Sequence, residues 1–265
     1  MSGLLSQYIA EVRRRFWLLK RYAIGSVADL LTFYVIFAGI YLSIRSVVGS
    51  VSPDEVAALA AAQIAGFLAF YFSSMVLSSI SNQLRQEADQ GTLEQLFIAS
   101  KGIIWIILAR LAATFTVDLA RAVPLFLLLS VTARNTIQVS PAFFLVFFLL
   151  LVGVYGFAIL LGGLTLLFKR TGQLPFLFQV LFLGFGFASL ADVPSELKSI
   201  LAVLPFARGV MLLKGIASGK ATGLTLLSYD FVVLLANAIG YVVAGTVFFL
   251  FAEHLAKKKG LLGRY

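Results

Sequence analysis

Residues 142–168 read AFFLVFFLLLVGVYGFAILLGGLTLLF, a stretch without a single charged side chain. Hydrophobic residues follow one another here without the alternation of a half-buried strand or the polar face of a soluble helix. As a helix rising about 1.5 Å per residue, the run would be roughly 40 Å long, which exceeds the ~30 Å hydrocarbon core of a bilayer. The stretch therefore predicts a transmembrane helix.

Similar apolar runs occur along the rest of the chain, at Ala23–Ile44, Val56–Ile80, Leu111–Val131, Leu174–Ala191 and Leu226–Phe251. The composition agrees with them, because the chain is 60% hydrophobic and only 12% charged, whereas a soluble domain carries about 25% charged residues. We expect an all-α membrane protein with six transmembrane helices in a domain spanning residues 23–252. Counts of five or seven spans stay open, because the run at 174–191 is short and the run at 111–131 is polar.

The first 22 residues predict an amphipathic helix that precedes the first span. Apolar side chains recur at spacings of three and four, and charged ones lie mostly elsewhere: Leu5, Ile9, Val12, Phe16 and Leu19 against Glu11, Arg13, Arg14, Arg15 and Lys20. Such a helix lies in the headgroup plane of a membrane, here at the cytoplasmic interface. A solvated helix with an incidental apolar stripe is the alternative.

Basic residues at the ends of the apolar runs predict the topology. With a cytoplasmic N-terminus, most Lys and Arg fall inside, and the outside receives Arg45, Arg134, Lys198, Arg208, Lys214 and Lys220. This bias follows the positive-inside rule. We expect a multi-pass protein of the cell (inner, cytoplasmic) membrane with both termini in the cytoplasm, the C-terminal one as a basic tail at residues 253–265. The net charge of +9 is explained by topology, so nucleic acid is not expected as a partner.

The residue inventory argues against an enzyme. The chain has no cysteine and one histidine, His254, beside a run of lysines. Thiol chemistry, Cys-ligated metals and Ser-His-Asp catalysis are thereby nearly excluded. We expect no catalytic residues, no metal site and no cofactor bound by this chain.

Residues 192–226 are too polar to span a bilayer and too apolar for a plain loop. Pro194 and Pro205 divide the segment, and short helical patterns appear at Ile200–Leu204 and Val210–Ile216. The segment predicts one or two short extracellular helices that dip into the outer leaflet, shielded by protein. An ordinary outer loop with some helix fits equally well.

The loop between the second and third runs, residues 81–101, is the most informative polar segment. It reads SNQLRQEADQGTLEQLFIASK, in which Gly91 permits a turn and Thr92 to Gln95 fit a capping box. Glu94 suits the positive end of the helix that follows. Side chains expected to face a cytoplasmic partner are the acidic and apolar ones around this turn: Glu87, Asp89, Gly91, Thr92, Leu93, Glu94, Leu96 and Phe97. A well-capped connector is the simpler alternative.

This loop, with Glu87 followed by Gly91 to Leu96, resembles the cytoplasmic loop motif of ABC-2 type permeases, the transmembrane subunits of one group of ATP-binding-cassette exporters. The order of an amphipathic N-terminal helix, six spans and a basic C-terminus also resembles that family. The resemblance implies that the loop is a coupling helix that contacts a cytoplasmic ABC ATPase subunit. The chain contains no G-x-x-x-x-G-K-[ST] phosphate loop, so ATP and magnesium would be bound by that partner, and a second permease copy or a paralogue would complete a dimer among membrane lipids.

Charged residues within the predicted spans are the other candidate site. Arg110, Asp118 and Arg121 lie in or next to the third run, and Asp118 and Arg121 can pair on one helix face at i, i+3. Asp29 in the first run is a further expected partner for Arg110 or Arg121. Because charge in hydrocarbon costs about 2.5–3.5 kcal/mol per residue, these side chains either line a transport path or form structural and snorkelling contacts near the inner leaflet.

The function expected from the resemblance is ATP-driven export of an amphipathic cargo such as a lipid or drug. An apolar interior rich in phenylalanine and the absence of a large outer domain favour this cargo. Export of a lipid-linked polysaccharide and a non-transporting membrane scaffold are the alternatives.

Overall fold

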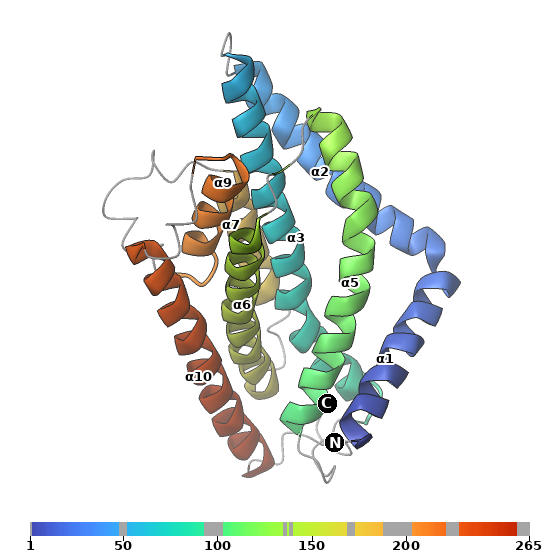
Figure 1. Ribbon diagram of the computed structural model, residues 1–265. Helices are drawn as coiled ribbons and strands as arrows, with labels where there is room; N and C mark the ends of the chain where they lie inside the picture. The colour runs from blue at the N-terminus through green and yellow to red at the C-terminus, as the bar shows by residue number, and fades with distance from the viewer. Residues whose placement is uncertain are drawn as a thin grey trace.

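The protein folds as a bundle of α-helices, seen in a computed structural model that describes residues 2–47, 52–92, 103–134, 137, 140–168, 173–187, 203–220 and 228–258. Over these residues the helices are α1 (Ser2–Arg21), α2 (Ala23–Val47), α3 (Pro53–Asp89), α5 (Ile103–Ala133), α6 (Pro141–Leu167), α7 (Gln173–Phe187), α9 (Ala207–Ala217) and α10 (Tyr229–Lys258) (Figure 1). Five of them are long and apolar enough to cross a membrane: α2, α3, α5 from Ala109, α6 and α10. The expected all-α, multi-helix membrane character is confirmed.

The predicted fifth span corresponds to α7, which is shorter than the others. Its 15 residues, Gln173–Phe187, would reach only about 22 Å along the helix axis, less than the ~30 Å hydrocarbon core. The last four residues predicted for this run, 188–191, lie outside the described residues. The described structure therefore contains five helices of spanning length, and not the six expected.

Helix α3 is the centre of the bundle and packs against α5, α6, α7 and α9. It begins with a full capping box, in which the Ser52 hydroxyl accepts from the Glu55 N–H and the Glu55 carboxylate accepts from the Ser52 N–H. It continues to Asp89, so residues 81–89, predicted as the start of a loop, are helical. These residues are polar, but most of them are good helix formers, so α3 extends beyond its apolar run.

Polar side chains on α3 bond directly to neighbouring helices. Gln63 Nε2 donates to the Phe187 carbonyl of α7 at 3.3 Å, and Thr165 of α6 donates to Ser81 at 3.1 Å. Hydrogen bonds between membrane helices each contribute on the order of 0.6 kcal/mol. They fix the rotational setting of α3 within an otherwise apolar core.

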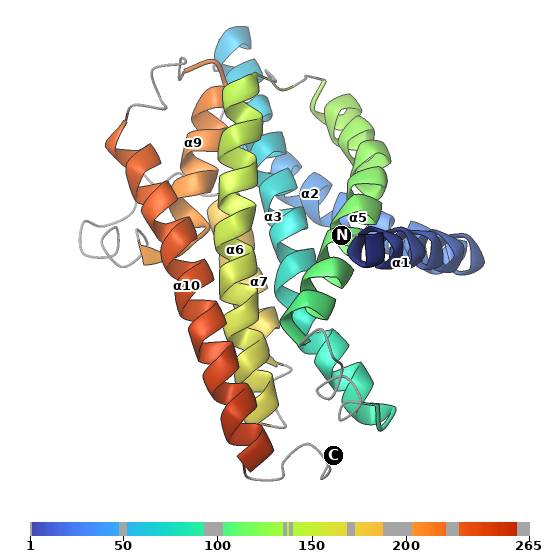
Figure 2. The ribbon, with the colours of Figure 1, turned by 60° about the horizontal axis from the view of Figure 1, so that its bottom comes forward.

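Helices α6 and α10 lie side by side over most of their length (Figures 1 and 2). Glycines make this possible, because a Cβ on Gly245 would collide with the Gly156 carbonyl, and a Cβ on Gly156 would collide with the backbone of Tyr241 and Val242. Small residues at such contacts let two helix backbones approach closely. The pair forms one wall of the bundle.

Helix α9 is buried among the long helices. Phe206, just before it, stacks on Phe182 of α7 with ring centroids 4.5 Å apart, and Val210, Leu213 and Ile216 are buried. The helical pattern predicted at 210–216 is confirmed, and its packing agrees with a shielded helix better than with an ordinary loop. Of the other predicted helix, at 200–204, the structure describes only residues 203 and 204.

Helix α1 is a single helix, as predicted, and leans away from the bundle (Figure 2). It meets α2 at Tyr22 and packs against α5, while α2 makes few contacts with the bundle. Ile9, Phe16 and Trp17 of α1 are exposed apolar side chains. After the bend at Tyr22, α1 packs against α5, and charged side chains of α1, α3 and α5 meet there.

Candidate functional site

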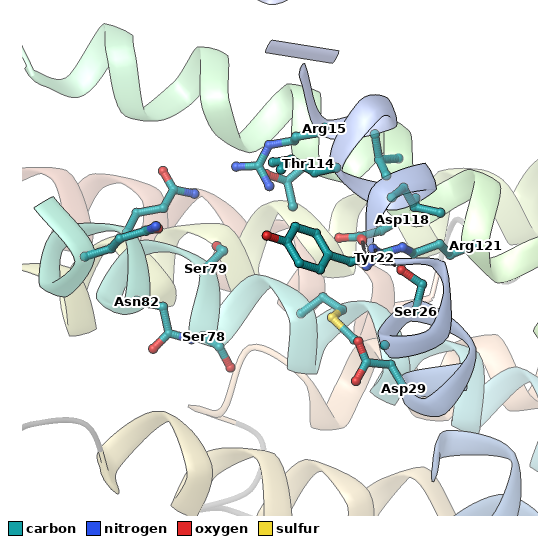
Figure 3. Close-up of a pocket in the computed structure, with 17 residues that line it drawn as sticks. Arg15, Tyr22, Ser26, Asp29, Ser78, Ser79, Asn82, Thr114, Asp118 and Arg121 are labelled. Carbon is teal, nitrogen blue, oxygen red and sulfur yellow. Dashed lines mark hydrogen bonds and ion pairs between the residues drawn. The ribbon is translucent and has the colours of Figure 1, made fainter. Parts of the chain in front are cut away.

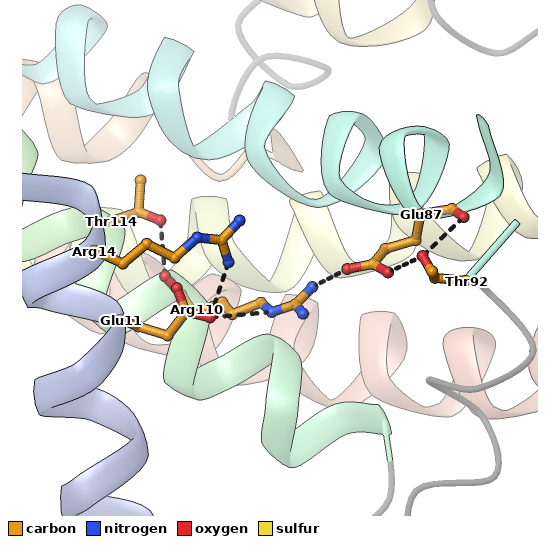
Figure 4. A network of polar contacts seen from close by, with 6 residues as sticks. All are labelled: Glu11, Arg14, Glu87, Thr92, Arg110 and Thr114. Atoms are coloured by element: carbon orange, nitrogen blue, oxygen red, sulfur yellow. Dashed lines mark hydrogen bonds and ion pairs between the residues drawn. The ribbon is translucent and has the colours of Figure 1, made fainter. Parts of the chain in front are cut away.

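An ion-pair network centred on Arg110 joins three helices at this end of the molecule (Figure 4). The Arg110 guanidinium of α5 donates from Nη1 to Glu87 Oε1 of α3 at 2.6 Å, and its Nε lies 3.6 Å from Glu11 Oε1 of α1. Glu11 is also 3.6 Å from Arg14. The three side chains at the centre are about one-fifth exposed, so this ion pair is shielded more than a surface pair and links α1, α3 and α5.

The network continues into the first residues after α3. Gly91 has a φ of +68°, and the N–H groups of Gly91 and Thr92 donate to the carbonyls of Ala88 and Glu87 at 3.1 and 2.9 Å. This is a Schellman motif, which needs a left-handed residue after the helix. The predicted turn at Gly91 is therefore confirmed. The Thr92 hydroxyl also donates to Glu87 Oε2 at 2.6 Å, so Glu87 holds both Arg110 and Thr92.

The other residues predicted to face a cytoplasmic partner separate into two groups. Asp89 lies at the exposed end of α3 and makes none of the network contacts. The second group lies outside the described residues and comprises Leu93, Glu94, Leu96 and Phe97. Of the capping box predicted at 92–95, the structure describes only Thr92. The structure thus brings Glu87, Gly91 and Thr92 together.

A polar cleft of about 500 Å³ lies next to this network, between α1, α2, α3 and α5 (Figure 3). Its polar and charged lining residues come from all four helices or the bend between α1 and α2: Arg15, Tyr22, Ser26, Asp29, Ser78, Ser79, Asn82, Gln83, Gln86, Thr114, Asp118 and Arg121. Leu18, Leu19, Met75 and Val117 form its apolar part. The cleft is unusual because polar groups concentrate within helices that are otherwise apolar.

The predicted pair Asp118 and Arg121 lies inside this cleft. The Arg121 guanidinium lies 3.8 Å from the buried Asp118 carboxylate and donates to Ser26 Oγ of α2 at 3.2 Å. The i, i+3 pairing is confirmed. Asp29 lines the same cleft but makes no ion pair with Arg110 or Arg121 among the described residues. The expected partnership of Asp29 was wrong, because Glu87, Glu11 and Asp118 lie closer to the two arginines.

Arg15 of α1 is the cleft residue that sequence reasoning missed. It is half-buried and faces the cleft, whereas its neighbours Arg13 and Arg14 are exposed. Burial lowers the pKa of the Arg15 guanidinium, and the nearby carboxylates of Glu11 and Asp118 oppose that change. The i, i+4 spacing of Glu11 and Arg15, which places both on one face of α1, is the signal that could have distinguished Arg15.

Several buried polar atoms of the cleft have unused hydrogen-bonding capacity. The Nε atoms of Arg15 and Arg121 and the Oε1 atom of Gln83 have no hydrogen-bond partner among the described residues. Buried polar atoms are nearly always bonded in native proteins, so these three atoms are unsatisfied polar groups in the wall of the cleft. The described residues include no group of three or more His, Cys, Asp or Glu side chains that could hold a metal ion.

The sequence matches no protein-family model, and no curated protein is significantly similar to it. The resemblance to ABC-2 type permeases therefore rests on Glu87, Gly91 to Leu96 and the layout of the chain alone.

Proposed function

We propose that this chain is the transmembrane permease subunit of an ABC-2 type exporter, which forms the translocation path for an amphipathic cargo, lipid or drug-like. In this proposal α1 lies at the cytoplasmic membrane interface, and α7 with the residues after it completes a sixth span. The protein lies in the inner (cytoplasmic) membrane of the cell, and both of its termini face the cytoplasm. The segment after Gly91 is the coupling helix.

The observation that carries the proposal is the Arg110 network. Glu87 binds Thr92, the first residue of the proposed coupling segment, at 2.6 Å and Arg110 of α5 at 2.6 Å, and Glu11 of α1 joins them at 3.6 Å. A displacement of the segment would therefore be transmitted to three helices through short, charge-assisted contacts. A simple connector between two spans needs no such linkage.

The cleft supports the cargo part of the proposal. Its walls come from α1, α2, α3 and α5, and the network joins three of those four helices. Movement of the coupling segment would thus change the shape of the cleft. Polar side chains together with an apolar part suit a molecule that has a polar head and an apolar body.

The partners follow from what the sequence lacks. The given sequence contains no phosphate-loop motif, and we propose that a cytoplasmic ABC ATPase subunit binds and hydrolyses ATP with magnesium. A second permease copy, identical or paralogous, would supply the other half of the path. Such a copy would also cover α2, in which only 11% of the apolar window is buried.

The test begins with a search for an ABC ATPase encoded beside this chain. The two proteins are then co-expressed, purified by affinity and assayed for ATPase activity in proteoliposomes. We expect Phe97→Ala and Glu94→Gln to weaken co-purification of the ATPase. Glu55→Gln, at the opposite end of α3, is the matched control and should leave association unchanged. Arg110→Gln should keep the ATPase bound but reduce cargo-stimulated hydrolysis, because it cuts the linkage behind the segment.

Transport is measured in the same vesicles with a fluorescent lipid analogue. ATP-dependent movement of the analogue that is lost in Arg110→Gln supports the exporter. An absent ATPase partner, or unchanged association and coupling in Phe97→Ala and Glu94→Gln, would refute it and favour a membrane scaffold. Association and coupling without movement of the lipid analogue would point to another cargo, such as a lipid-linked polysaccharide.

A further inference from the structure

The polar cleft has the donors and the shape to recognise one chemical group. We propose that it binds a phosphate carried by an amphipathic molecule of the bilayer, held between Arg15 and Arg121. This inference rests on the proposed function and deepens it, because it names phospholipid-like molecules as the cargo class. It also assigns a role to Arg15, a residue that is not part of the resemblance to ABC-2 type permeases.

Arg121 has most of its hydrogen-bonding capacity unused. Among the described residues, its guanidinium donates one hydrogen bond, to Ser26 Oγ at 3.2 Å. The 3.8 Å separation from Asp118 is an ion pair but too long for a hydrogen bond. A guanidinium carries several N–H donors in a planar fork that matches two oxygens of a phosphate.

Arg15 provides the second positive charge. It makes no hydrogen bond or ion pair with any described residue, and the carboxylates of Glu11 and, less strongly, Asp118 act on it electrostatically. Glu11, one turn away, forms its ion pairs with Arg14 and Arg110, each at 3.6 Å. Since a guanidinium stays charged even when burial lowers its pKa, Arg15 keeps a positive charge that no ion pair neutralises.

The remaining polar groups fit the rest of a headgroup. Figure 3 shows Ser78, Ser79 and Asn82 of α3 facing the cleft from the side opposite Arg15 and Thr114. Asp29 lies on the α2 side, away from Arg15, where its carboxylate can accept hydrogen bonds from headgroup hydroxyls. Asp118 therefore lies with the two arginines on the α1 and α5 side, whereas Asp29 lies on the α2 side.

The apolar part of the cleft explains why the phosphate would belong to an amphipath. Leu18 belongs to this apolar part, and Tyr22 of the polar lining adds the apolar face of its ring. The two side chains are 42% and 61% exposed, so they extend the surface of the cleft outward. A volume of about 500 Å³ suits a headgroup, and acyl chains would leave across these exposed side chains into the bilayer. A free phosphate would gain nothing from them.

The test measures ligand retention by the purified full-length chain in mild detergent, using native mass spectrometry. Three probes separate the sources of affinity: phosphatidylglycerol, diacylglycerol with the same acyl chains, and inorganic phosphate. We expect the wild-type chain to retain phosphatidylglycerol, to retain little diacylglycerol, and to be unaffected by millimolar inorganic phosphate.

Two arginine variants and two comparison variants complete the design. Arg15→Gln and Arg121→Gln should each weaken phosphatidylglycerol binding roughly tenfold, because each removes charge-assisted hydrogen bonds. Arg13→Gln, an exposed arginine on the same helix, should change nothing. Asp118→Asn should strengthen binding, because it frees Arg121 from its ion pair; a gain cannot result from misfolding.

Three results would overturn the inference. The first is that the wild-type chain and all variants retain phosphatidylglycerol equally, and the second is that the wild-type chain retains diacylglycerol as well as phosphatidylglycerol. The third is that inorganic phosphate binds in an arginine-dependent way and displaces the lipid. Because the chain is assayed without an ATPase, the outcome is separate from the proposed function. Arginine-dependent lipid binding with no ATPase partner would refute only the exporter. An ATPase partner with arginine-independent lipid binding would refute only the phosphate site.

Discussion

The contact between α6 and α10 gives a sharp prediction about the glycines that build it. In Gly245→Ala, the new methyl group of α10 would overlap the Gly156 carbonyl of α6. That neighbour is a backbone atom, so no change of side-chain rotamer can relieve the overlap. Helices α6 and α10 must therefore move apart, which disturbs their packing along the wall of the bundle that they form.

The expected magnitude follows from two opposing terms. Alanine is favoured over glycine in a helix by about 1 kcal/mol, and overpacking a close contact costs about 1–3 kcal/mol. Because the overlap here is with backbone, the upper end of that range applies. We therefore expect Gly245→Ala to lower the free energy of unfolding by about 2 kcal/mol.

The matched control lies on the same helix. A Cβ added at Gly240 of α10 meets nothing within 4 Å, so Gly240→Ala should be neutral or stabilising by up to about 1 kcal/mol. The assay is reversible unfolding of both variants by SDS in mixed micelles, followed by circular dichroism. If Gly245→Ala is as stable as Gly240→Ala, the packing of α6 on α10 described above is wrong.

Further predictions concern α9 and its surroundings. Burial lowers the pKa of Lys214 from 10.5 to about 8. Between pH 8 and 10.5 the unfolded chain therefore binds more protons than the folded chain, so the free energy of unfolding should rise with pH. Lys214→Met should abolish that rise in SDS unfolding, and an equal rise in both proteins would contradict the prediction. Arg208 forms an ion pair with Asp230. A double-mutant cycle with Arg208→Gln and Asp230→Asn should give a coupling energy of about 0.5–1 kcal/mol, and zero coupling would mean that the pair contributes nothing to stability. Phe206→Ala removes the ring stacked on Phe182 and should cost about 3–5 kcal/mol in the same assay; a cost below ~1 kcal/mol would show that α9 is not held by this ring.

The sequence alone determined the features that depend on neighbouring residues. Apolar runs such as Ala142–Phe168 became long helices, because a segment without polar side chains must satisfy its backbone internally in lipid. The turn at Gly91 and the pairing of Asp118 with Arg121 were likewise predictable, since a left-handed turn and an i, i+3 contact are local geometry.

Tertiary packing alone decided which charged side chains meet. Arg110 reaches Glu87 across 23 residues of sequence and Arg121 reaches Ser26 across 95, and no periodicity within one helix contains that information. The spacing of Glu11 and Arg15 places both on one face of α1, but the packing of α1 against α5 decides that this face meets the cleft. Helix–helix contacts depend on shape complementarity between surfaces far apart in the chain, so the polar cleft is a property of the assembled bundle.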